Sequence, residues 1–271
     1  MSRCSVVQQY AITTRNQWFQ RLINLRDSRR RRHRDRLLFF EGVTLTNALS
    51  DEWRVVALAS PARKRLSEWT ETQVTRLAPE TRLLLDEALF DEVSTKEDAS
   101  SELIAIIGAP PLDGVRLPVD HTVLLMDRPS SHGNFGTILR AADAFGAGGV
   151  VMTGHAIDPF DPRTLRASAG SFFRVPVARL DGAALTSWLD ETGATLVGTT
   201  AWADEQLGDV ALPVSMVLAF GNEKSGLSER LKARCDRLIG IEMAGYATSL
   251  NVANMVSICL YEARRQQRAG A

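Results

Sequence analysis

The sequence predicts two α/β domains, a small one at the N-terminus and a larger one at the C-terminus with a parallel sheet between helices. Three observations support this prediction. Short apolar runs alternate with helical patterns along the 271 residues, which is typical of α/β folds. A Pro- and Gly-rich stretch at 108–119 separates residues 1–107 from 120–271 and is expected to be a linker. Several later runs are continuously apolar, as in sheets buried on both faces.

The N-terminal part opens with a helical pattern over residues 15–35, in which Trp18, Leu22 and Leu25 form one apolar stripe. Strand-like runs follow and alternate with helical segments, which indicates a small α/β domain. The expected strands are 36–42, 54–59, 73–78 and 102–108, and the expected helices are 43–50, 61–70 and 80–92.

The C-terminal part alternates more regularly, which favours a doubly wound parallel sheet. Its last element is a long helix, 249–268, whose basic end suits the helix dipole. The expected strands are 123–126, 149–153, 174–178, 195–199, 216–220 and 238–241, and the expected helices between them are 134–146, 161–169, 182–192 and 228–235.

The charge of the chain is unevenly distributed, although its formal net charge is zero. Residues 1–40 contain ten Arg, no Lys and two acidic residues, a formal charge of +8, so the remainder carries −8. A basic arm on an acidic protein indicates local contact with a polyanion, and a solvated helix end is the alternative.

Several classes of protein are excluded by what the sequence lacks. It has no signal-peptide pattern and no apolar run near 18 residues, so no membrane segment is expected. Its four histidines have no metal-ligand spacing, and no metal is expected. Its three cysteines form no CxxC pair, which favours a reduced, cytoplasmic protein.

Three blocks rich in Gly, Asn and Ser follow expected strands, at residues 128–147, 218–229 and 241–255. Polar, backbone-exposing residues at consecutive strand ends indicate a ligand pocket at that edge of the sheet. Each block alone also fits an ordinary turn or helix cap. None contains GxGxxG or GK[ST], so a nicotinamide site and a phosphate loop are not supported.

Together the blocks resemble the SpoU/TrmH branch of the SPOUT RNA methyltransferases. The resemblance covers about residues 122–268, and a weaker one joins residues 36–49 to the family's small substrate-binding domain. The matching residues are Asn134, Gly136, Ile138 and Arg140 in the first motif, Phe220-Gly221-Asn222-Glu223 and Gly226 in the second, and Ile241, Met243, Gly245 and Ser249-Leu250-Asn251-Val252 in the third.

The resemblance implies transfer of a methyl group from S-adenosylmethionine to a ribose 2′-hydroxyl in structured RNA, with rRNA favoured over tRNA. It also implies a deep trefoil knot and a homodimer formed through the C-terminal domain. The arginine run would then contact RNA through Arg29, Arg30, Arg31, Arg32 and Arg34. The cofactor contacts implied by motif matching are Thr199, Thr200, Gly221, Ile241, Met243 and Leu250.

The implied catalytic residues are Arg140, Asn134, Glu223, Ser249 and Asn251. The family's usual proposal makes Arg140 the base, although a free guanidinium has a pKa of roughly 12.5–13.8. The alternative is that Arg140 grips a neighbouring phosphate while the other four orient the hydroxyl. Two competing classes are an RNA-binding protein without turnover and a SPOUT enzyme that methylates a base.

Overall fold

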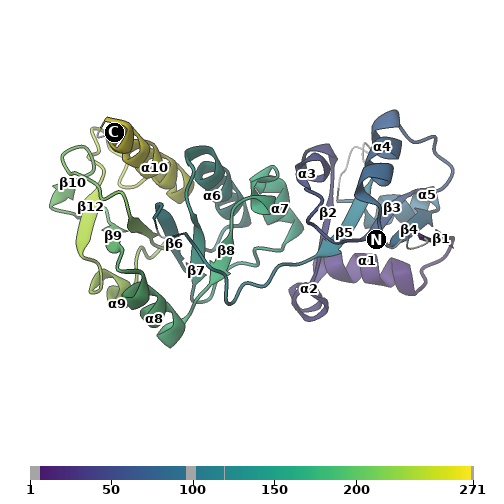
Figure 1. Cartoon of the computed structure of the whole chain (residues 1–271), viewed down its shortest axis with the longest axis horizontal. Coiled ribbons are helices and arrows are strands. Elements are labelled where there is room, and N and C mark those ends of the chain that lie inside the picture. The colour runs from purple at the N-terminus through teal and green to yellow at the C-terminus, as the bar shows by residue number, and fades with distance from the viewer. Residues whose placement is uncertain (1–6, 96–101, 119, 270–271) are drawn as a thin grey trace, which may run out of the picture. The chain divides into compact units, whose positions relative to one another are not determined.

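The computed structural model describes residues 7–95, 102–118 and 120–269 (Figure 1). The chain forms two compact units. The N-terminal unit comprises residues up to 110 together with 158–170, and the C-terminal unit comprises 111–157 and the residues from 171 onward. The inclusion of 158–170 in the N-terminal unit was not expected from the sequence, which placed this segment with the C-terminal domain.

The N-terminal unit is built on a five-stranded sheet in the order β1-β4-β3-β5-β2. β5 pairs antiparallel with β2 and β3, and the other pairs are parallel. The strands are β1 (Gln8–Ile12), β2 (Leu37–Glu41), β3 (Val55–Pro61), β4 (Thr81–Leu85) and β5 (Ile104–Gly108). The predicted strands at 36–42, 54–59 and 102–108 are therefore confirmed, whereas β1 was missed.

Three predictions in this unit are wrong. The expected helix 61–70 is displaced, because the helix begins only at Glu68, after its cap Ser67. Residues 73–78 belong to a helix rather than a strand, because Thr70, Gln73 and Leu77 are buried at helical spacing. The expected helix 80–92 is instead a strand followed by a short helix that begins after Asp86. The helices are α1 (Gln17–Asp27), α2 (Arg29–Asp35), α3 (Val43–Ala48), α4 (Glu68–Leu77), α5 (Glu87–Val93) and α7 (Pro162–Ser168).

The expected single helix over residues 15–35 is interrupted at Ser28. The backbone of Ser28 is extended, and its hydroxyl accepts a hydrogen bond from the Arg31 amide. Ser28 therefore ends α1 and caps α2, the usual role of serine at a helix N-terminus. Because of the interruption, the arginine-rich α2 is a separate helix from α1. Phe19, Leu22 and Leu25 of α1 pack into the core.

The C-terminal unit contains a seven-stranded sheet in the order β10-β12-β9-β11-β6-β7-β8, and every pair is parallel. The predicted parallel sheet is confirmed, and only the two-residue β10 was missed. The strands are β6 (Val123–Asp127), β7 (Gly149–Thr153), β8 (Val177–Arg179), β9 (Thr195–Thr199), β10 (Glu205–Gln206), β11 (Met216–Phe220) and β12 (Arg237–Gly240).

Helices cover both faces of this sheet, as predicted (Figure 1). On one face, Leu185 and Leu189 of α8 and Leu231 of α9 pack into a cluster with Val123 and Val217 of the sheet. α6 and α10 contact each other on the opposite face. The bounds are α6 (His132–Phe145), α8 (Gly182–Thr192), α9 (Glu229–Lys232) and α10 (Val252–Ala269), with a 3₁₀ turn at Ser171–Phe173. The trefoil knot stays a prediction.

The parallel strand order brings the three polar blocks together. β6, β9, β11 and β12 run in the same direction, so their carboxyl ends lie along one edge of the sheet. The first block follows β6 and enters α6, the second follows β11, and the third follows β12 and leads into α10. This is the edge at which open α/β sheets bind their ligands.

Candidate active site

A cavity of about 690 Å³ lies at the carboxyl ends of β9, β11 and β12. Its volume falls within the range of small-molecule sites, roughly 300–1,000 Å³. Every residue predicted to be catalytic or to bind the cofactor lines it, except Arg140. These residues are Asn134, Thr199, Thr200, Gly221, Glu223, Ile241, Met243, Ser249, Leu250 and Asn251.

A chain of side-chain hydrogen bonds joins the three blocks inside this cavity. The Asn134 amide Nδ2 donates to Oε1 of Glu223 at 3.2 Å. The Asn251 amide Nδ2 in turn donates to Oδ1 of Asn134 at 3.0 Å. Asn134 opens α6, Glu223 follows β11 and Asn251 precedes α10, so each bond ties together residues from distant parts of the sequence.

The amide orientations in this chain are determined at both ends by chemistry. An ionised carboxylate only accepts hydrogen bonds, so Asn134 must present its NH₂ group to Glu223. A backbone amide only donates, so Asn251 must present Oδ1 to the Ala253 N–H, at 2.9 Å. The central bond from Asn251 to Asn134 then follows without choice. Replacement of either asparagine by aspartate would put an acceptor where a donor is needed.

Glu223 is held as an anion. Burial opposes its ionisation, but hydrogen bonds from the Ser130 hydroxyl, from backbone amides and from Asn134 outweigh this effect and lower the pKa of Glu223. Oε2 accepts from the Ser130 hydroxyl at 2.6 Å and from its amide at 3.2 Å, and Oε1 accepts from the Ser131 amide at 3.3 Å. A carboxylate with a lowered pKa is a weak base, so Glu223 is better suited to organising the site than to removing a proton.

The second block is shaped by two residues that were not among the predicted site residues, Arg128 and Asn222. Asn222 exchanges two backbone hydrogen bonds with Gly226, and its Nδ2 donates to the carbonyl of Arg128 at 2.8 Å. The Arg128 guanidinium donates to the Gly226 carbonyl at 2.9 Å and also bonds the buried carboxylate of Asp127. The sequence signal that could have identified Arg128 is its place beside Asp127 at the end of a buried strand, whereas Asn222 was already among the residues that match the second motif.

Gly221 is required by the loop itself. A Cβ at Gly221 would lie 2.0 Å from the backbone of Gly226 and Leu227, a distance that no relaxation of a side chain can relieve. The resemblance to the family implied Gly221 as a cofactor contact by motif matching. The structure shows a more direct reason for a glycine here: the same loop folds back, so that the backbone of Gly226 and Leu227 lies against Gly221.

We expect Gly221→Ala to distort the loop, to lower stability by about 1–3 kcal/mol, as overpacking typically does, and to weaken S-adenosylmethionine binding by tenfold or more. Gly208→Ala is the matched control, since a Cβ there meets nothing within 4 Å. Thermal unfolding and titration calorimetry of both variants would check this. Unchanged cofactor affinity in Gly221→Ala would mean that the loop does not form the cofactor site.

Thr199 and Leu250 contribute to the cavity in different ways. The buried Thr199 hydroxyl donates to the Ala219 carbonyl at 3.0 Å, which links β9 to β11. Leu250 is exposed and lines the cavity beside Ile241 and Met243. These three side chains supply an apolar wall, while the loop at Gly221 supplies backbone groups.

Arg140 lies outside this cavity. It follows Asn134 by six residues, about one and two-thirds turns of α6, and so points to a different side of the helix. Arg140 lies on the solvent-exposed side of α6, together with the exposed residues Gly133, Thr137 and Ala144. Within the described part of the chain Arg140 has no hydrogen-bond or ion-pair partner, so its guanidinium is available to another molecule.

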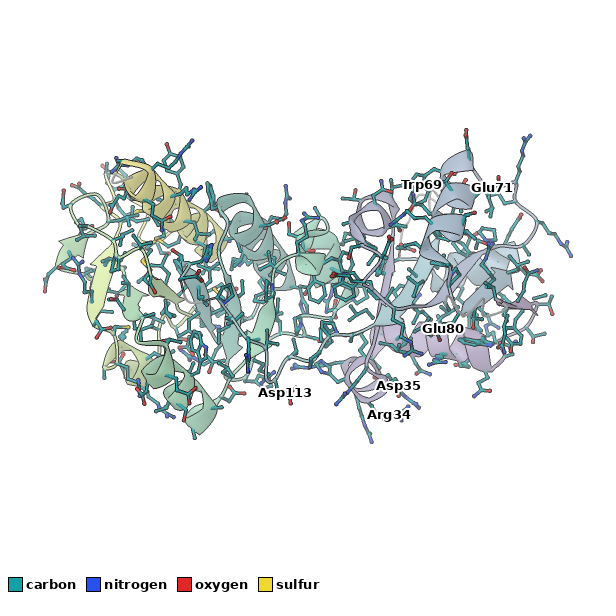
Figure 2. The ribbon with its side chains drawn as sticks, viewed as in Figure 1. Arg34, Asp35, Trp69, Glu71, Glu80 and Asp113 are labelled. Atoms are coloured by element: carbon teal, nitrogen blue, oxygen red, sulfur yellow. The ribbon has the colours of Figure 1, made fainter. Side chains whose placement is uncertain are left out.

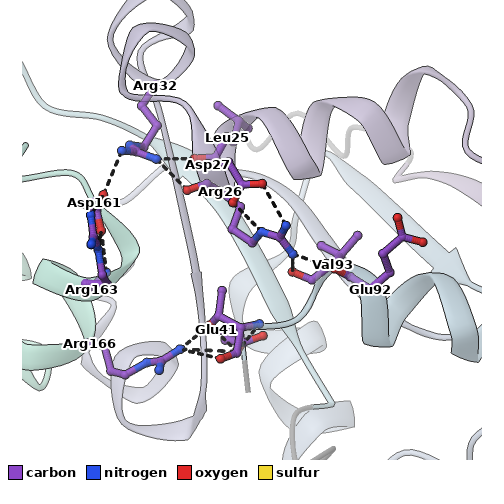
Figure 3. A network of polar contacts seen from close by, with 11 residues as sticks. Leu25, Arg26, Asp27, Arg32, Glu41, Glu92, Val93, Asp161, Arg163 and Arg166 are labelled. Atoms are coloured by element: carbon purple, nitrogen blue, oxygen red, sulfur yellow. Dashed lines mark hydrogen bonds and ion pairs between the residues drawn. The ribbon is translucent and has the colours of Figure 1, made fainter. Parts of the chain in front are cut away.

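The predicted RNA-binding run divides into buried and exposed members. Arg32 is 1% exposed. Its guanidinium pairs with Asp158 at 2.8 Å and Asp161 at 3.2 Å, and it donates to the carbonyl of Leu25 at 2.9 Å. Figure 3 shows the contact with Asp161. Arg32 therefore holds residues 158–170 within the N-terminal unit and is not available to a phosphate. Arg32 is therefore not one of the proposed RNA contacts.

Most of the other members of the run are exposed to solvent. Arg29, Arg30 and Arg34 are exposed on α2, and Arg31 on the same helix is half-buried. Arg34 pairs with its neighbour Asp35 at 2.7 Å at the surface of α2 (Figure 2). An ion pair between adjacent exposed residues is weak, so Arg34 can exchange this partner for a phosphate.

Among the residues that the structure describes, no group of three or more His, Cys, Asp or Glu side chains could hold a metal ion. No helix in these residues is long and apolar enough to cross a membrane. Cys235 and Cys259 are free thiols, and burial raises their pKa to about 11 and about 12. Cys4 lies outside the described residues.

Comparison with known proteins agrees with the geometry. The family model described as "SpoU rRNA Methylase family" matches residues 121–261, and that described as "SpoU L30e-like domain" matches residues 16–105. The chain therefore belongs to the SpoU rRNA methylase family. The sequence-based assignment to this family, to its α/β fold and to S-adenosylmethionine-dependent RNA methyltransferases is confirmed.

Relatives extend over almost the whole chain. The 23S rRNA (uridine(2479)-2′-O)-methyltransferase of Streptomyces viridochromogenes is 35% identical and covers 96% of this chain and 93% of its own. The SpoU methyltransferase AviRb from the same organism, in complex with AdoMet, superposes with a TM-score of 0.86 at 35% identity, over 95% of this chain and 100% of its own. An AdoMet-bound rRNA methyltransferase from Sinorhizobium meliloti gives a TM-score of 0.82 at 28% identity, over 95% and 98% of the two chains.

Proposed function

We propose that this protein methylates a ribose 2′-hydroxyl of ribosomal RNA with S-adenosylmethionine as the methyl donor. The observation that carries the proposal is the cavity in which Glu223, Asn134 and Asn251, one from each block, form a continuous hydrogen-bonded chain. Relatives that cover most of the chain or of its C-terminal part are named as 23S rRNA 2′-O-methyltransferases, which favours rRNA over tRNA. An RNA substrate and the free thiols of Cys235 and Cys259 both fit a cytoplasmic protein.

The lining of the cavity suits the cofactor. Ile241, Met243 and Leu250 offer apolar contacts for an adenine ring, and the loop from Gly221 offers backbone groups to the polar parts of the molecule. The bound cofactor supplies a methyl group on a positively charged sulfur, which is already a good donor. The protein must therefore mainly bring the hydroxyl into line with that methyl and let its proton leave.

We propose that the Glu223–Asn134–Asn251 chain keeps the three loops in register so that the hydroxyl meets a preorganised site. Ser249, exposed on the rim of the cavity, is placed to hydrogen-bond the ribose. Glu223 is an unsuitable base because its pKa is lowered and its oxygens already accept four hydrogen bonds. The proton then leaves to water or, in the other scheme open for this family, to Arg140.

We further propose a homodimer formed through the C-terminal unit, in which Arg140 serves the cavity of the partner. Arg140 is exposed and does not line the cavity of its own chain. α10, which packs on α6, exposes Ile258 and Tyr261, and the ring of Tyr261 contacts Phe145 of α6. A second copy seated on this apolar face would bring Arg140 to the partner's cavity. Among the described residues that line this cavity, the first block contributes Asn134 and no positively charged side chain.

The assay for this function is methyl transfer from labelled S-adenosylmethionine to ribosomal RNA, followed by complete nuclease digestion and separation of nucleosides. We expect the label in a 2′-O-methyl nucleoside. Label in a methylated base would indicate the base-methylating class. Tight RNA and cofactor binding without transfer would indicate an RNA-binding protein that has lost turnover.

The exposed part of the arginine run should contribute RNA affinity and no chemistry. We expect conversion of Arg29, Arg30 and Arg34 to Gln to weaken RNA binding. The slope of log affinity against log salt concentration should become shallower by about 0.7–0.9 for each phosphate that is no longer neutralised. Cofactor affinity should not change, because the cavity belongs to the other unit. The control replaces Arg264, Arg265 and Arg268 of α10, which carry equal formal charge. An equal change of slope in both variants would mean that only net charge matters.

A further inference from the structure

Trp202 differs from the other tryptophans of the chain in its exposure. All five lie in the described residues, and the other four are half-buried, whereas Trp202 is 93% exposed. It sits in the loop after β9, where its amide donates to the Thr200 hydroxyl at 3.4 Å. A fully hydrated indole contributes almost nothing to the stability of the fold, because it removes little apolar surface from water.

The position of Trp202 connects it to the active site. It lines the same cavity as Asn134 and Glu223, together with the exposed cation Lys224. With 93% of its surface in solvent, the indole stands on the rim rather than among the buried walls. A molecule that arrives from solvent can therefore cover the face of this indole.

We propose that Trp202 stacks on an unpaired base of the RNA substrate at the mouth of the cavity and so positions the target nucleotide. This inference rests on the proposed function. Proteins commonly bind unpaired RNA bases by stacking them on exposed aromatic rings. Lys224 on the same rim supplies a positive charge for the adjoining phosphate. An aromatic face beside a cation matches a nucleotide, which has a flat base and an anionic phosphate.

The test compares Trp202→Ala and Trp202→Phe in the full chain, with Val214→Ala as the matched control. Val214 is exposed in the same unit but does not line the cavity. With an in vitro transcript of ribosomal RNA, we expect Trp202→Ala to raise the KM for RNA about tenfold, as expected for the loss of one stacked base. Trp202→Phe should keep most of the affinity, and S-adenosylmethionine binding should stay at the level of the parent protein in all variants.

Fluorescence gives a second readout that needs no turnover. Addition of the transcript should quench the emission of the parent protein more than that of Trp202→Phe, since stacking on a base quenches indole. An unchanged KM for RNA in Trp202→Ala would overturn the proposal, and so would a fall in cofactor affinity, which would show that the indole covers the cofactor. If the parent protein methylates no RNA, the proposed function fails, and the quenching difference still decides the role of Trp202.

Discussion

Arg140→Ala should abolish methyl transfer while leaving the fold and the affinity for S-adenosylmethionine intact. The side chain is exposed on α6 and has no partner in the described part of the chain, so its removal leaves no buried group unsatisfied. It also lies outside the cavity that holds the predicted cofactor contacts. We expect turnover to fall by at least about a hundredfold, within the range for removal of one group that stabilises the transition state, and a single-turnover assay with labelled cofactor would measure this. Near-normal turnover would remove Arg140 from the catalytic set.

Two further experiments separate the possible roles of Arg140. Arg140→Lys keeps the charge but not the two-pronged donor geometry, so a strong decrease in turnover supports a bidentate phosphate contact. If Arg140 serves the partner's cavity, a mixture of Arg140→Ala with Asn134→Ala chains should regain activity, because each mixed dimer contains one complete site. If the mixture recovers no activity although light scattering shows that the protein is dimeric, each chain uses its own arginine.

Arg32→Ala should be the most destabilising substitution in the N-terminal unit. It would leave Asp158 and Asp161 without the guanidinium that pairs with both, of which Figure 3 shows the contact with Asp161. Breaking a buried ion pair by removing one partner costs about 3–5 kcal/mol. The destabilisation should appear in denaturant unfolding followed by a probe in this unit. Arg30→Ala, an exposed neighbour on the same helix, is the control and should leave stability within about 0.5 kcal/mol.

The same cluster predicts how stability depends on pH. Burial disfavours the charged form of Asp158, but the hydrogen bond from His33 and the charge of Arg32 outweigh it and lower the pKa of Asp158. A carboxyl with a lowered folded-state pKa contributes stability above its unfolded pKa, about 3.9, and that stability disappears as pH falls through the folded value. We therefore expect the N-terminal unit to become less stable below about pH 4. Asp158→Asn in the Arg32→Ala background should restore part of the stability, since the uncompensated charge is then gone.

The catalytic half of the fold could be predicted because its information is local. Continuous apolar runs such as β11 are recognisable one at a time, and parallel strands necessarily bring their carboxyl ends to one edge. Asn134, Glu223 and Asn251 could therefore be expected in one cavity from the sequence alone. Their direct hydrogen bonds to one another could not, because these depend on distances between loops that periodicity does not encode.

Three other features could not be predicted, because contacts between distant parts of the sequence decide them. Arg32 looked like one of five equivalent arginines, and only the folded chain shows that it meets Asp158, 126 positions away. The segment 158–170 was assigned by its neighbours in sequence, but its contacts place it with the N-terminal unit. Residues 73–78 are too short a stretch for their pattern to separate a strand from a helix, and packing decides for the helix.

The most direct test of the proposed function is the identity of the methylated atom. Purified protein, labelled S-adenosylmethionine and unmodified ribosomal RNA would be incubated, and the RNA would be digested and resolved by chromatography with mass spectrometry. We expect one additional 2′-O-methyl nucleoside per transcript, and none with Arg140→Ala. A methyl group on a base, or no transfer to RNA by a protein that binds the cofactor, would contradict the proposal.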